Sequence, residues 1–434
     1  MTSLAGSFKT LSYWEKNNMD KNKSDIWVYT HWIGMSDPKC IGILSAHFSK
    51  GRKSFSFEYD KDWISSHEQI LLDPDLGWYN GPQFPNKKDN FGIFLDSMPD
   101  SWGRTLMQRR EPQRAIEENR EPRILHDIDY LLGVYDESRM GALRFKIDPL
   151  GPFLETAPGT TIPPWTTLGE LQEAAKAIES DEDDYNIRKW IAMLLAPGSS
   201  LGGARPKANF SNKSNDLWIA KFPSKNDTID KAAWEFLAFR MAAKAGIIMS
   251  DSGISKISGN YNTFLTKRFD RIKKERIHFA SAMTMTGNTE ESLRDKKASY
   301  LEIAEFIKFS GASNKEDLYQ LWRRIVFNIS ISNTDDHLRN HGFLLSEDGW
   351  RLSPAFDVNP SIDKQGLALN IDMDNNALDF ELAKSVGEFF MLNTDMMSKI
   401  LTEVKSVVKE WRKYANSIGI PKTEQDRMTP AFRF

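Results

Sequence analysis

The sequence predicts an α+β fold with more than one domain, and three observations lead to this class. The chain has 434 residues, which is too long for one ordinary hydrophobic core. Short β-rich runs separated by glycine, proline and lysine fill residues 26–60. Beyond residue 270 the pattern becomes mainly helical. Hydrophobic residues make up 40% and charged residues 27% of the chain, which is typical of a globular protein.

Composition argues against several other classes. The net charge of -3 gives no global basic field, so tight sequence-independent binding to nucleic acid is not expected. The single cysteine, Cys40, cannot form an internal disulfide, which suits a reducing cytoplasm. The first residues lack the apolar core of a signal peptide, and no window is long and apolar enough to cross a bilayer. We therefore expect a cytoplasmic protein without a membrane partner.

The first module is an α+β unit that opens with the sheet of residues 26–60. Residues 95–110 read as a helix after Pro99, with Asp100 or Ser101 as its N-cap. A further strand over residues 141–147 closes the module.

Five of the nineteen prolines fall within residues 148–165, a density that excludes a helix or a central strand. We expect an interdomain linker there and a domain boundary near residue 165.

The second part begins with a helix capped by Thr167 and ending before the acidic run 181–184, which reads as a solvated turn. A small sheet with one helix then precedes the helical remainder. Its expected elements are a glycine-rich segment at 197–205, strands near 207–210 and 217–222, a helix over 228–245, and a strand ending at 264–266.

Three segments in this part suit phosphoryl transfer from ATP, which needs a backbone cradle for phosphates and a fixed cation. The glycine-rich segment from Ser199 to Arg205 is the cradle candidate, because adjacent glycines let backbone N–H groups approach phosphate oxygens. Lys221 ends an apolar strand, where a buried cation needs a negative partner. Glu235, on the following helix, is a carboxylate that could hold Lys221 in place. Alternatively, the glycines form an ordinary turn and both charged residues face solvent.

The strongest pattern is the run Asp335-Asp336-His337-Leu338-Arg339-Asn340. Asp335 and Asn340 have the Asp-x-x-x-x-Asn spacing of a kinase catalytic loop, in which the aspartate orients the attacking hydroxyl and the asparagine binds Mg²⁺. Asp357 follows a predicted strand pair that would return it to the same site as a second Mg²⁺ ligand. The alternative is a chance loop of Asx residues, which form turns readily.

A rival interpretation uses His337 and His341, which have the i,i+4 spacing of metal ligands on a helix. A zinc protease would need glutamate where Leu338 stands. A metal-dependent phosphoesterase remains open as an alternative.

The order of these motifs predicts a two-lobed protein-kinase-like fold, with a small β-rich lobe and a mainly helical large lobe, preceded by the N-terminal α+β module. The predicted domains are residues 1–165, including the linker, and residues 166–434. Within the second domain the small lobe covers about 166–268 and the helical lobe about 269–434.

The chain resembles, from end to end, the HipA-type serine/threonine kinase toxins of bacterial toxin–antitoxin modules. In the first half the matching runs are Ile41-Gly42-Ile43-Leu44, Leu95 to Asp100 and Ser138 to Ala142. In the second half they are Ser200 to Lys207, Trp218 to Pro223, Lys267 to Arg271, Asn333 to Asn340 and Pro354 to Asp357.

The resemblance implies a role for each matching residue. Asp335 would be the catalytic aspartate, Asn340 and Asp357 the Mg²⁺ ligands, and Ser200 the autophosphorylated serine, with Ser199 beside it as the other candidate. Phosphate on that serine would repel the charge of ATP and silence the enzyme. The implied ATP-binding residues are Leu201, Gly202, Gly203, Ala204, Arg205, Lys207, Lys221, Glu235 and Phe269, of which Phe269 would line the adenine pocket.

Three positions depart from the family pattern. Asp336 stands where a small residue is usual, so an extra negative charge near Mg²⁺ is expected to tune its affinity or weaken activity. Arg205 stands where glutamine is familiar. Asp357 follows Phe356 rather than preceding it, so activation control need not copy eukaryotic kinases.

The resemblance further implies a toxin that phosphorylates serine or threonine on a protein, with an aminoacyl-tRNA synthetase as the suggested substrate. A small helix-turn-helix antitoxin would restrain it, and DNA would be contacted only through that antitoxin. Two alternatives stay open: a small-molecule phosphotransferase, and a catalytically silent corepressor that keeps the kinase fold.

Overall fold

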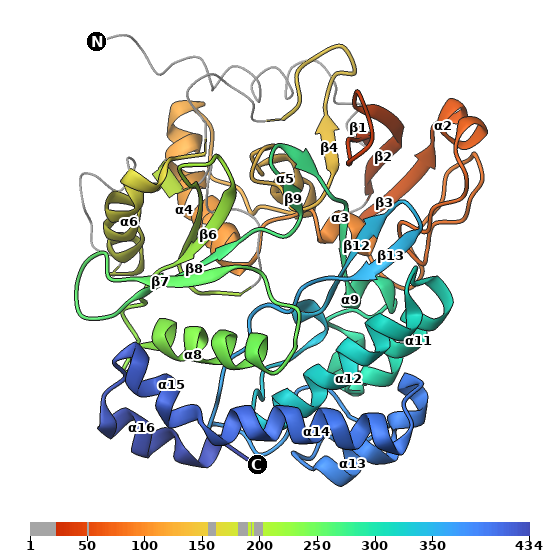
Figure 1. Cartoon of the computed structure of the whole chain (residues 1–434). Helices are drawn as coiled ribbons and strands as arrows, with labels where there is room; N and C mark the ends of the chain where they lie inside the picture. Colours follow the sequence, from red (N-terminus) through yellow and green to blue (C-terminus); the bar gives the residue numbers. More distant parts are fainter. Residues whose placement is uncertain (1–22, 50–51, 155–161, 181–189, 192, 195–202) are drawn as a thin grey trace. The chain divides into compact units, whose positions relative to one another are not determined.

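The computed structural model describes residues 23–49, 52–154, 162–180, 190–191, 193–194 and 203–434 (Figure 1). The chain divides into two compact units. Unit 1 contains residues up to 217 and the return segment 270–279, and unit 2 contains residues 218–269 and 280–434. The predicted division at residue 165 therefore remains a prediction, as do the lobe boundaries.

Unit 1 is built around a four-stranded antiparallel sheet in the order β3-β2-β1-β4. One face of β1 is buried because alternate side chains point to the same side of a strand, and Val28 pairs there with Phe145. Phe94 packs on the sheet against Phe57 and Phe145, with ring centroids 5.5 and 6.2 Å away. The strands are β1 (Lys23–Thr30), β2 (Lys39–Ser49), β3 (Arg52–Tyr59) and β4 (Leu143–Lys146).

The helices of unit 1 include the one predicted after Pro99. It begins at Ser101, and its N-cap Asp100 accepts a hydrogen bond from Gly103 N at 2.8 Å. It continues past Arg110 to Glu117, with Pro112 inside it. The elements are α2 (Lys61–Ser66), α3 (Gly92–Leu95), α4 (Ser101–Glu117), α5 (Asp127–Leu132), η1 (Trp165–Thr167), α6 (Leu168–Ser180), β5 (Lys207–Ser211), β9 (Arg271–Ile272) and β10 (Glu275–Arg276).

One sequence expectation shifts slightly here, and another is not tested. Thr167 lies in the 3-10 turn η1, where its hydroxyl donates to Pro164 O, and α6 follows from Leu168 as predicted. The acidic run 181–184 lies outside the described residues.

A buried arginine ties several segments of unit 1 together. Arg139 has no exposed surface, and its guanidinium donates to the carbonyls of Ser97, Leu131 and Val134 at 2.7, 3.0 and 2.9 Å. It also lies over the Phe145 ring, 4.6 Å from the centroid. Arg139 thus satisfies carbonyls near the end of α5 that would otherwise be buried without partners.

Unit 2 opens with an antiparallel sheet in which β6 pairs with β8 and β8 pairs with β7. Helix α8 packs on this sheet and begins at Lys231, three residues after the predicted start, because Asp230 is its N-cap and accepts from Ala233 N at 3.0 Å. The elements are β6 (Leu217–Lys221), which starts at the unit boundary, β7 (Ser252–Ser255), β8 (Thr263–Lys267) and α8 (Lys231–Lys244).

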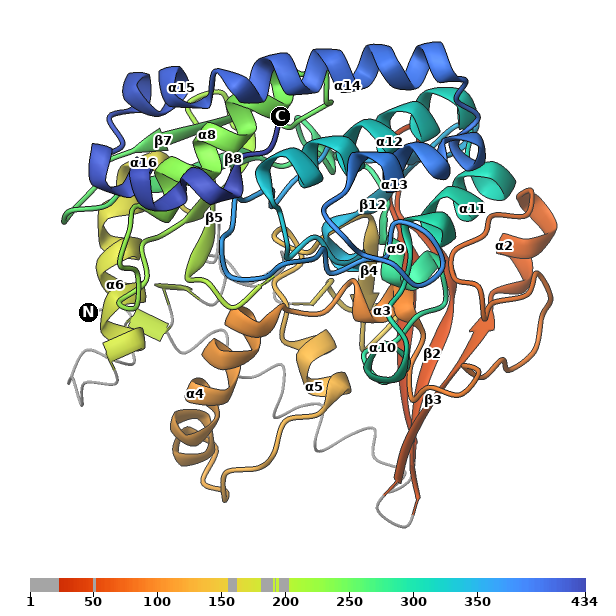
Figure 2. The same ribbon diagram turned by 90° about the horizontal axis from the view of Figure 1, so that it is seen from below.

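The rest of unit 2 is mainly helical, as predicted, and centres on α12. This helix buries thirteen of its eighteen residues and packs against α11, α13 and α14 (Figure 2). The other elements are β11 (Phe279–Ser281), α9 (Ala282–Met285), α10 (Ser292–Asp295), α11 (Tyr300–Ser310), α12 (Asn314–Ile331), η2 (Leu338–Asn340), β12 (Gly342–Ser346), β13 (Gly349–Leu352), α13 (Phe380–Ser385), η3 (Gly387–Phe390), α14 (Thr394–Lys409), α15 (Trp411–Ile418), α16 (Lys422–Met428) and η4 (Thr429–Ala431).

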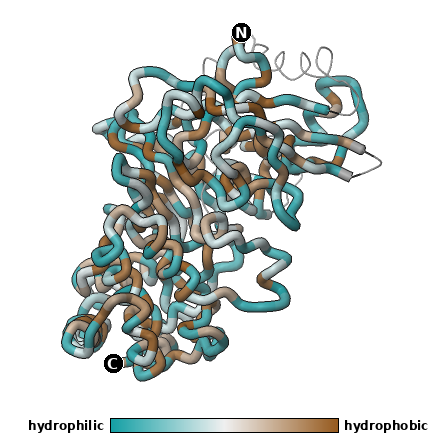
Figure 3. The backbone as a smooth tube through the Cα atoms, turned by 90° about the vertical axis from the view of Figure 1, so that its right-hand side faces the viewer, coloured by the Kyte–Doolittle hydropathy of each residue, from teal (hydrophilic) through white to brown (hydrophobic). Residues whose placement is uncertain are grey.

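Hydrophobic and hydrophilic stretches alternate along the chain in both units (Figure 3), as amphipathic elements that bury one face require. Among the described residues, no helix is both long and apolar enough to span a membrane.

The segment after α16 folds back onto the end of α12. Arg433 N donates to Ser330 O at 2.7 Å, and Ser332 Oγ donates to Ala431 O at 2.8 Å. Phe432 stacks on Trp411 with ring centroids 4.1 Å apart. This segment therefore lies against the residues that lead into the run Asp335 to Asn340.

Candidate active site

The centre of the candidate site is a lysine held by two carboxylates. Lys221 Nζ lies 2.6 Å from Glu235 Oε1 and 2.9 Å from Asp357 Oδ1. Lys221 ends strand β6, and Glu235 lies on the buried side of α8. Asp357 comes from a segment 136 residues further along the chain. The lysine and Glu235 side chains are only 12% and 9% exposed, so the alternative of two solvent-facing residues is wrong.

Charge explains how this lysine is stabilised. Burial by itself would lower the pKa of Lys221, but the carboxylates of Asp357 and Glu235 outweigh it and raise the pKa above its usual value. The ammonium group therefore stays charged at physiological pH. A fixed cation that can meet a phosphate is one of the parts that phosphoryl transfer needs.

Asp335 lies on a loop that starts where α12 ends. The helix stops at Ile331 because Ser332 adopts a left-handed conformation, with φ of 51°. The Asp335 side chain is 77% exposed, and Lys364 Nζ lies 3.3 Å from its Oδ1. Nothing in the sequence pattern singled out Lys364, which lies seven positions after Asp357.

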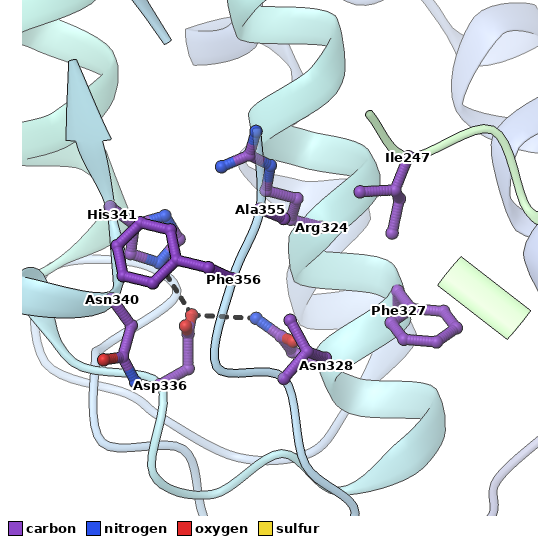
Figure 4. A pocket seen from close by; sticks show the side chains of 10 residues that line it. Ile247, Arg324, Phe327, Asn328, Asp336, Asn340, His341, Ala355 and Phe356 are labelled. Carbon is purple, nitrogen blue, oxygen red and sulfur yellow. Dashed lines mark hydrogen bonds and ion pairs between the residues drawn. The ribbon is translucent and has the colours of Figure 1, made fainter. Parts of the chain in front are cut away.

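Asn340 lies near the other end of the loop, in η2. Its side-chain Nδ2 donates to the carbonyl oxygen of Asp335 at 3.1 Å, which leaves Oδ1 as the acceptor for a cation. Asn340 also lines a small pocket together with Phe356 and Val358, the two neighbours of Asp357 (Figure 4). The segments that carry both predicted Mg²⁺ ligands therefore meet at one pocket.

These two residues fit a magnesium ion by their chemistry. Mg²⁺ prefers hard oxygen ligands and retains several waters, so one amide oxygen and one carboxylate are sufficient protein ligands. Asp357 adopts a positive φ of 56°, a conformation that costs free energy in a non-glycine residue. Such strain is commonest at functional sites.

The aromatic residue predicted to line an adenine pocket lies beside the Asp357 segment. The ring centroids of Phe269 and Phe356 are 5.3 Å apart. Phe269 follows β8, whose Phe264 pairs with Lys221 on β6. An apolar ring thus lies beside the segment that carries Asp357, just after the strand that pairs with the strand of the cation.

The structure gives Asp336, the extra negative charge expected near Mg²⁺, a buried position. Its side chain accepts hydrogen bonds from Asn328 and His341 (Figure 4) and from Tyr300. Burial would raise the pKa of Asp336, but the interactions with His341 and Tyr300 outweigh it and lower the pKa. The negative charge of Asp336 is therefore stabilised by hydrogen bonds in the interior of unit 2. The sequence analysis did not single out Tyr300, which lies 36 residues before Asp336, or Asn328, which lies on the apolar helix that precedes the motif.

The two histidines of the rival interpretation lie in different environments. His337 is exposed, whereas His341 is buried and its Nε2 lies 2.8 Å from Asp336 Oδ2. Across the described residues, no group of three or more His, Cys, Asp or Glu side chains is placed to hold a metal ion. The structure thus gives the two-histidine interpretation no support.

The described part of the glycine-rich segment belongs to unit 1. Gly203 has a positive φ of 93°, which favours glycine, and its carbonyl accepts from Lys207 Nζ at 3.1 Å. Lys207 is buried and forms an ion pair with Asp100, the N-cap of α4, at 2.7 Å. Ala204 is exposed and Arg205 is half-buried. Ser199, Ser200, Leu201 and Gly202 lie outside the described residues, and their predicted roles stay predictions.

Comparisons with known proteins show which family and which fold this chain resembles. Residues 199–411 match the family model of the HipA-like C-terminal domain. A curated Haemophilus influenzae protein described as a putative kinase is 24% identical over 179 residues, which cover 37% of this chain and 52% of that protein. The match thus spans about half the length of that curated relative.

A solved structure also matches nearly the whole chain. It is a chain of the Shewanella oneidensis MR-1 complex of the toxin–antitoxin system HipA, HipB and its operator DNA. The TM-score is 0.64 at 18% identity, and 94% of each chain is covered. This likeness confirms the predicted fold class, α+β with a two-lobed kinase-like fold.

Proposed function

Because residues 199–411 make this chain a member of the HipA-like C-terminal domain family, we propose that it is an ATP- and Mg²⁺-dependent serine/threonine protein kinase. The observation that carries the proposal is the pairing of Lys221 with both Glu235 and Asp357. Positions 14 and 136 residues away supply the two carboxylates, so this is not a local surface pair. A lysine–glutamate ion pair and an aspartate for Mg²⁺ are the parts that a kinase must assemble.

Each proposed role follows from the chemistry of the side chain. Lys221, positioned by Glu235, would grip the nucleotide phosphates, and the segment Leu201 to Arg205, with Lys207, would cover them. Asn340 and Asp357 would hold Mg²⁺, which when bound with ATP neutralises phosphate charge. Phe269 would contact the adenine ring.

Asp335 is proposed as the catalytic aspartate because its carboxylate is exposed to an incoming substrate. It would accept the hydrogen bond of a serine or threonine hydroxyl and orient it toward the γ-phosphate. The hydroxyl oxygen then forms its bond to phosphorus as the bond to ADP breaks, and the hydroxyl proton passes to the carboxylate or to solvent. Lys364, beside Asp335, supplies positive charge near this step.

Regulation and partners are part of the same proposal. Autophosphorylation of Ser200, or of Ser199, would place negative charge near the nucleotide phosphates and inhibit the enzyme. The matching Shewanella chain was solved in a complex with HipB and operator DNA. We accordingly propose a small helix-turn-helix antitoxin as partner, DNA contact only through it, and a toxin activity on a protein substrate such as an aminoacyl-tRNA synthetase.

The test is transfer of labelled phosphate from Mg-ATP to the purified protein, with the modified residue located by mass spectrometry. Wild-type protein should become labelled on Ser199 or Ser200. Asp335→Asn should lower the rate by roughly 100-fold or more, because it removes the base while keeping the shape. The matched control is Asp374→Asn, an exposed aspartate of the same unit, which should leave the rate unchanged.

Two results would count against the proposal. Wild-type protein of unmodified mass that binds ATP without transferring phosphate would favour a silent corepressor. Transfer to a small molecule, with no labelling of this or any other protein, would favour a small-molecule phosphotransferase.

A further inference from the structure

We propose that Asp336 is the positioning residue that holds Asp335 and Asn340 in the geometry needed for phosphoryl transfer. The inference rests on the proposed function and adds to it a residue that does not itself touch substrate. It starts from the contrast between two adjacent aspartates: the side chain of Asp335 is 77% exposed, whereas that of Asp336 is 4% exposed.

Three donors from three places in unit 2 converge on one oxygen of Asp336. Its Oδ2 accepts from Tyr300 Oη of α11 at 2.5 Å, from Asn328 Nδ2 of α12 at 2.8 Å, and lies 2.8 Å from His341 Nε2. The two helices are fixed by their own packing. The carboxylate therefore anchors the loop to a rigid part of the unit.

The anchor acts on both ends of the loop. Because Asp336 points into the protein, the preceding residue, Asp335, is left pointing to solvent, where a substrate hydroxyl can reach it. At the other end, His341 follows Asn340 directly, and Asn340 Nδ2 donates to Asp335 O at 3.1 Å. The network extends to the start of the loop, since Asn333 Nδ2 donates to Asn328 Oδ1 at 3.0 Å.

Stability alone does not account for a carboxylate at this position. Burying a charge carries a desolvation cost that its partners only partly offset. Well-packed apolar side chains at such a position often give the fold equal or greater stability. A buried charge that accepts three hydrogen bonds does restrict the loop to one conformation. That restriction matters here, because a displacement of about 1 Å at a reacting group can lower a rate by about 100-fold.

The experiment compares Asp336→Asn with Asp317→Asn. Asp317 is likewise a buried aspartate, but it lies on α12. It accepts hydrogen bonds from Arg351 and from Leu352 N, so its substitution disturbs unit 2 in a similar way. We expect Asp336→Asn to lower kcat by roughly 10- to 100-fold with KM for ATP changed less than about 3-fold. Asp317→Asn should lower stability but leave kcat per folded molecule close to the wild-type value.

Tyr300→Phe provides a graded variant, because it removes one donor and preserves the ring. Its kcat should fall by a smaller factor, about 3- to 10-fold, than that of Asp336→Asn. A kcat for Asp336→Asn equal to wild type, or an equal loss in Asp317→Asn, would overturn the inference.

A second readout keeps this inference separate from the proposed function. Amide hydrogen exchange of residues 333–341 measures how firmly the loop is held and needs no activity. Exchange should be faster in Asp336→Asn than in wild type or Asp317→Asn. If wild-type protein transfers no phosphate, the proposed function fails, while unchanged exchange in Asp336→Asn would by itself show that Asp336 does not position the loop.

Discussion

Lys221 lies between two carboxylates that have different tasks in the proposed mechanism. Glu235 is a positioning partner, whereas Asp357 would have to bind Mg²⁺ through the same carboxylate that now contacts the lysine. A metal ion alone would compete with the ammonium group for Asp357. A nucleotide phosphate would offer Lys221 another anion, so metal and nucleotide should each strengthen the binding of the other.

In unit 1, the buried side chain of His278 makes the free energy of unfolding depend on pH. Its ring is 1% exposed and stacks on Trp32 with centroids 5.7 Å apart. Burial lowers the pKa of His278 to about 3, below the unfolded value of about 6.5. The neutral ring therefore stabilises the fold above about pH 6.5, and this stability is lost as the pH falls from 6.5 toward 3.

His278→Phe keeps an aromatic ring but removes the titrating group. We therefore expect the free energy of unfolding of this variant to decrease less than that of the wild type as the pH falls. Urea unfolding between pH 7 and pH 4 should give a wild-type free energy that falls more steeply than that of the variant, by up to about 1.4 kcal/mol per pH unit. His67→Phe, at an exposed position, is the control and should follow the wild type. Parallel curves for wild type and His278→Phe would contradict the assignment.

The sequence predicted some of these residues and missed others for a physical reason. Lys221 and Glu235 were identified because strand and helix periodicity places charged groups within apolar elements. The burial of Asp336 was not predicted, because a sequence does not reveal which side of a loop faces the protein interior. Its donor Tyr300 lies 36 residues away, and only tertiary packing brings the two together.

At the scale of elements, local signals predicted the start of α4 better than its end. Asp100 caps α4 as expected, since a short side chain that bonds the first free N–H is a local property. The same helix continues beyond the predicted end and tolerates Pro112 in its interior. The hairpin of β12 and β13 was also predicted, between Asn340 and Asp357, from a turn flanked by apolar residues.

The elements of unit 1 also depend on Arg139, a buried side chain whose hydrogen bonds reach carbonyls of other segments. Arg139→Met should lower the free energy of unfolding by about 3 kcal/mol or more, because three buried carbonyls lose their donor. Denaturant unfolding of wild type and variant measures this difference in the free energy of unfolding. Arg123→Met removes a partly exposed ion pair with Asp129 and should cost less than about 1 kcal/mol. Equal losses in the two variants would show that the buried guanidinium has no special role.

At the scale of the whole molecule, the chain forms two compact units, and residues 270–279 belong to the first of them. The proline-rich run is a local signal for a linker, and Lys207, from beyond it, forms an ion pair with Asp100 in the same compact unit. The two residues are 107 positions apart, and no sequence pattern connects them. Composition thus predicted the fold class, while the grouping of segments depended on contacts between distant residues.

Two phenylalanines near the end of unit 2 allow a matched test of the segment that packs against the residues leading into the run Asp335 to Asn340. Phe432 is 8% exposed and stacked on Trp411, whereas Phe434 is 57% exposed. Phe432→Ala should lower the free energy of unfolding by about 3 kcal/mol, and Phe434→Ala by less than about 0.5 kcal/mol. Urea unfolding followed by tryptophan fluorescence would measure both. Equal stability of the two variants would show that the stacked ring contributes nothing.

The same segment has a consequence for the protein while it is being synthesised. Ser332, three residues before Asp335, donates to Ala431, which lies 99 positions later in the chain. At about 5–20 residues per second, a ribosome needs roughly 5–20 s to make that stretch. For most of this interval the nascent chain contains the whole run from Asp335 to Asn340 but lacks the segment that packs against the residues leading into it. In the proposed kinase, these contacts would therefore form only after nearly all of unit 2 has been translated.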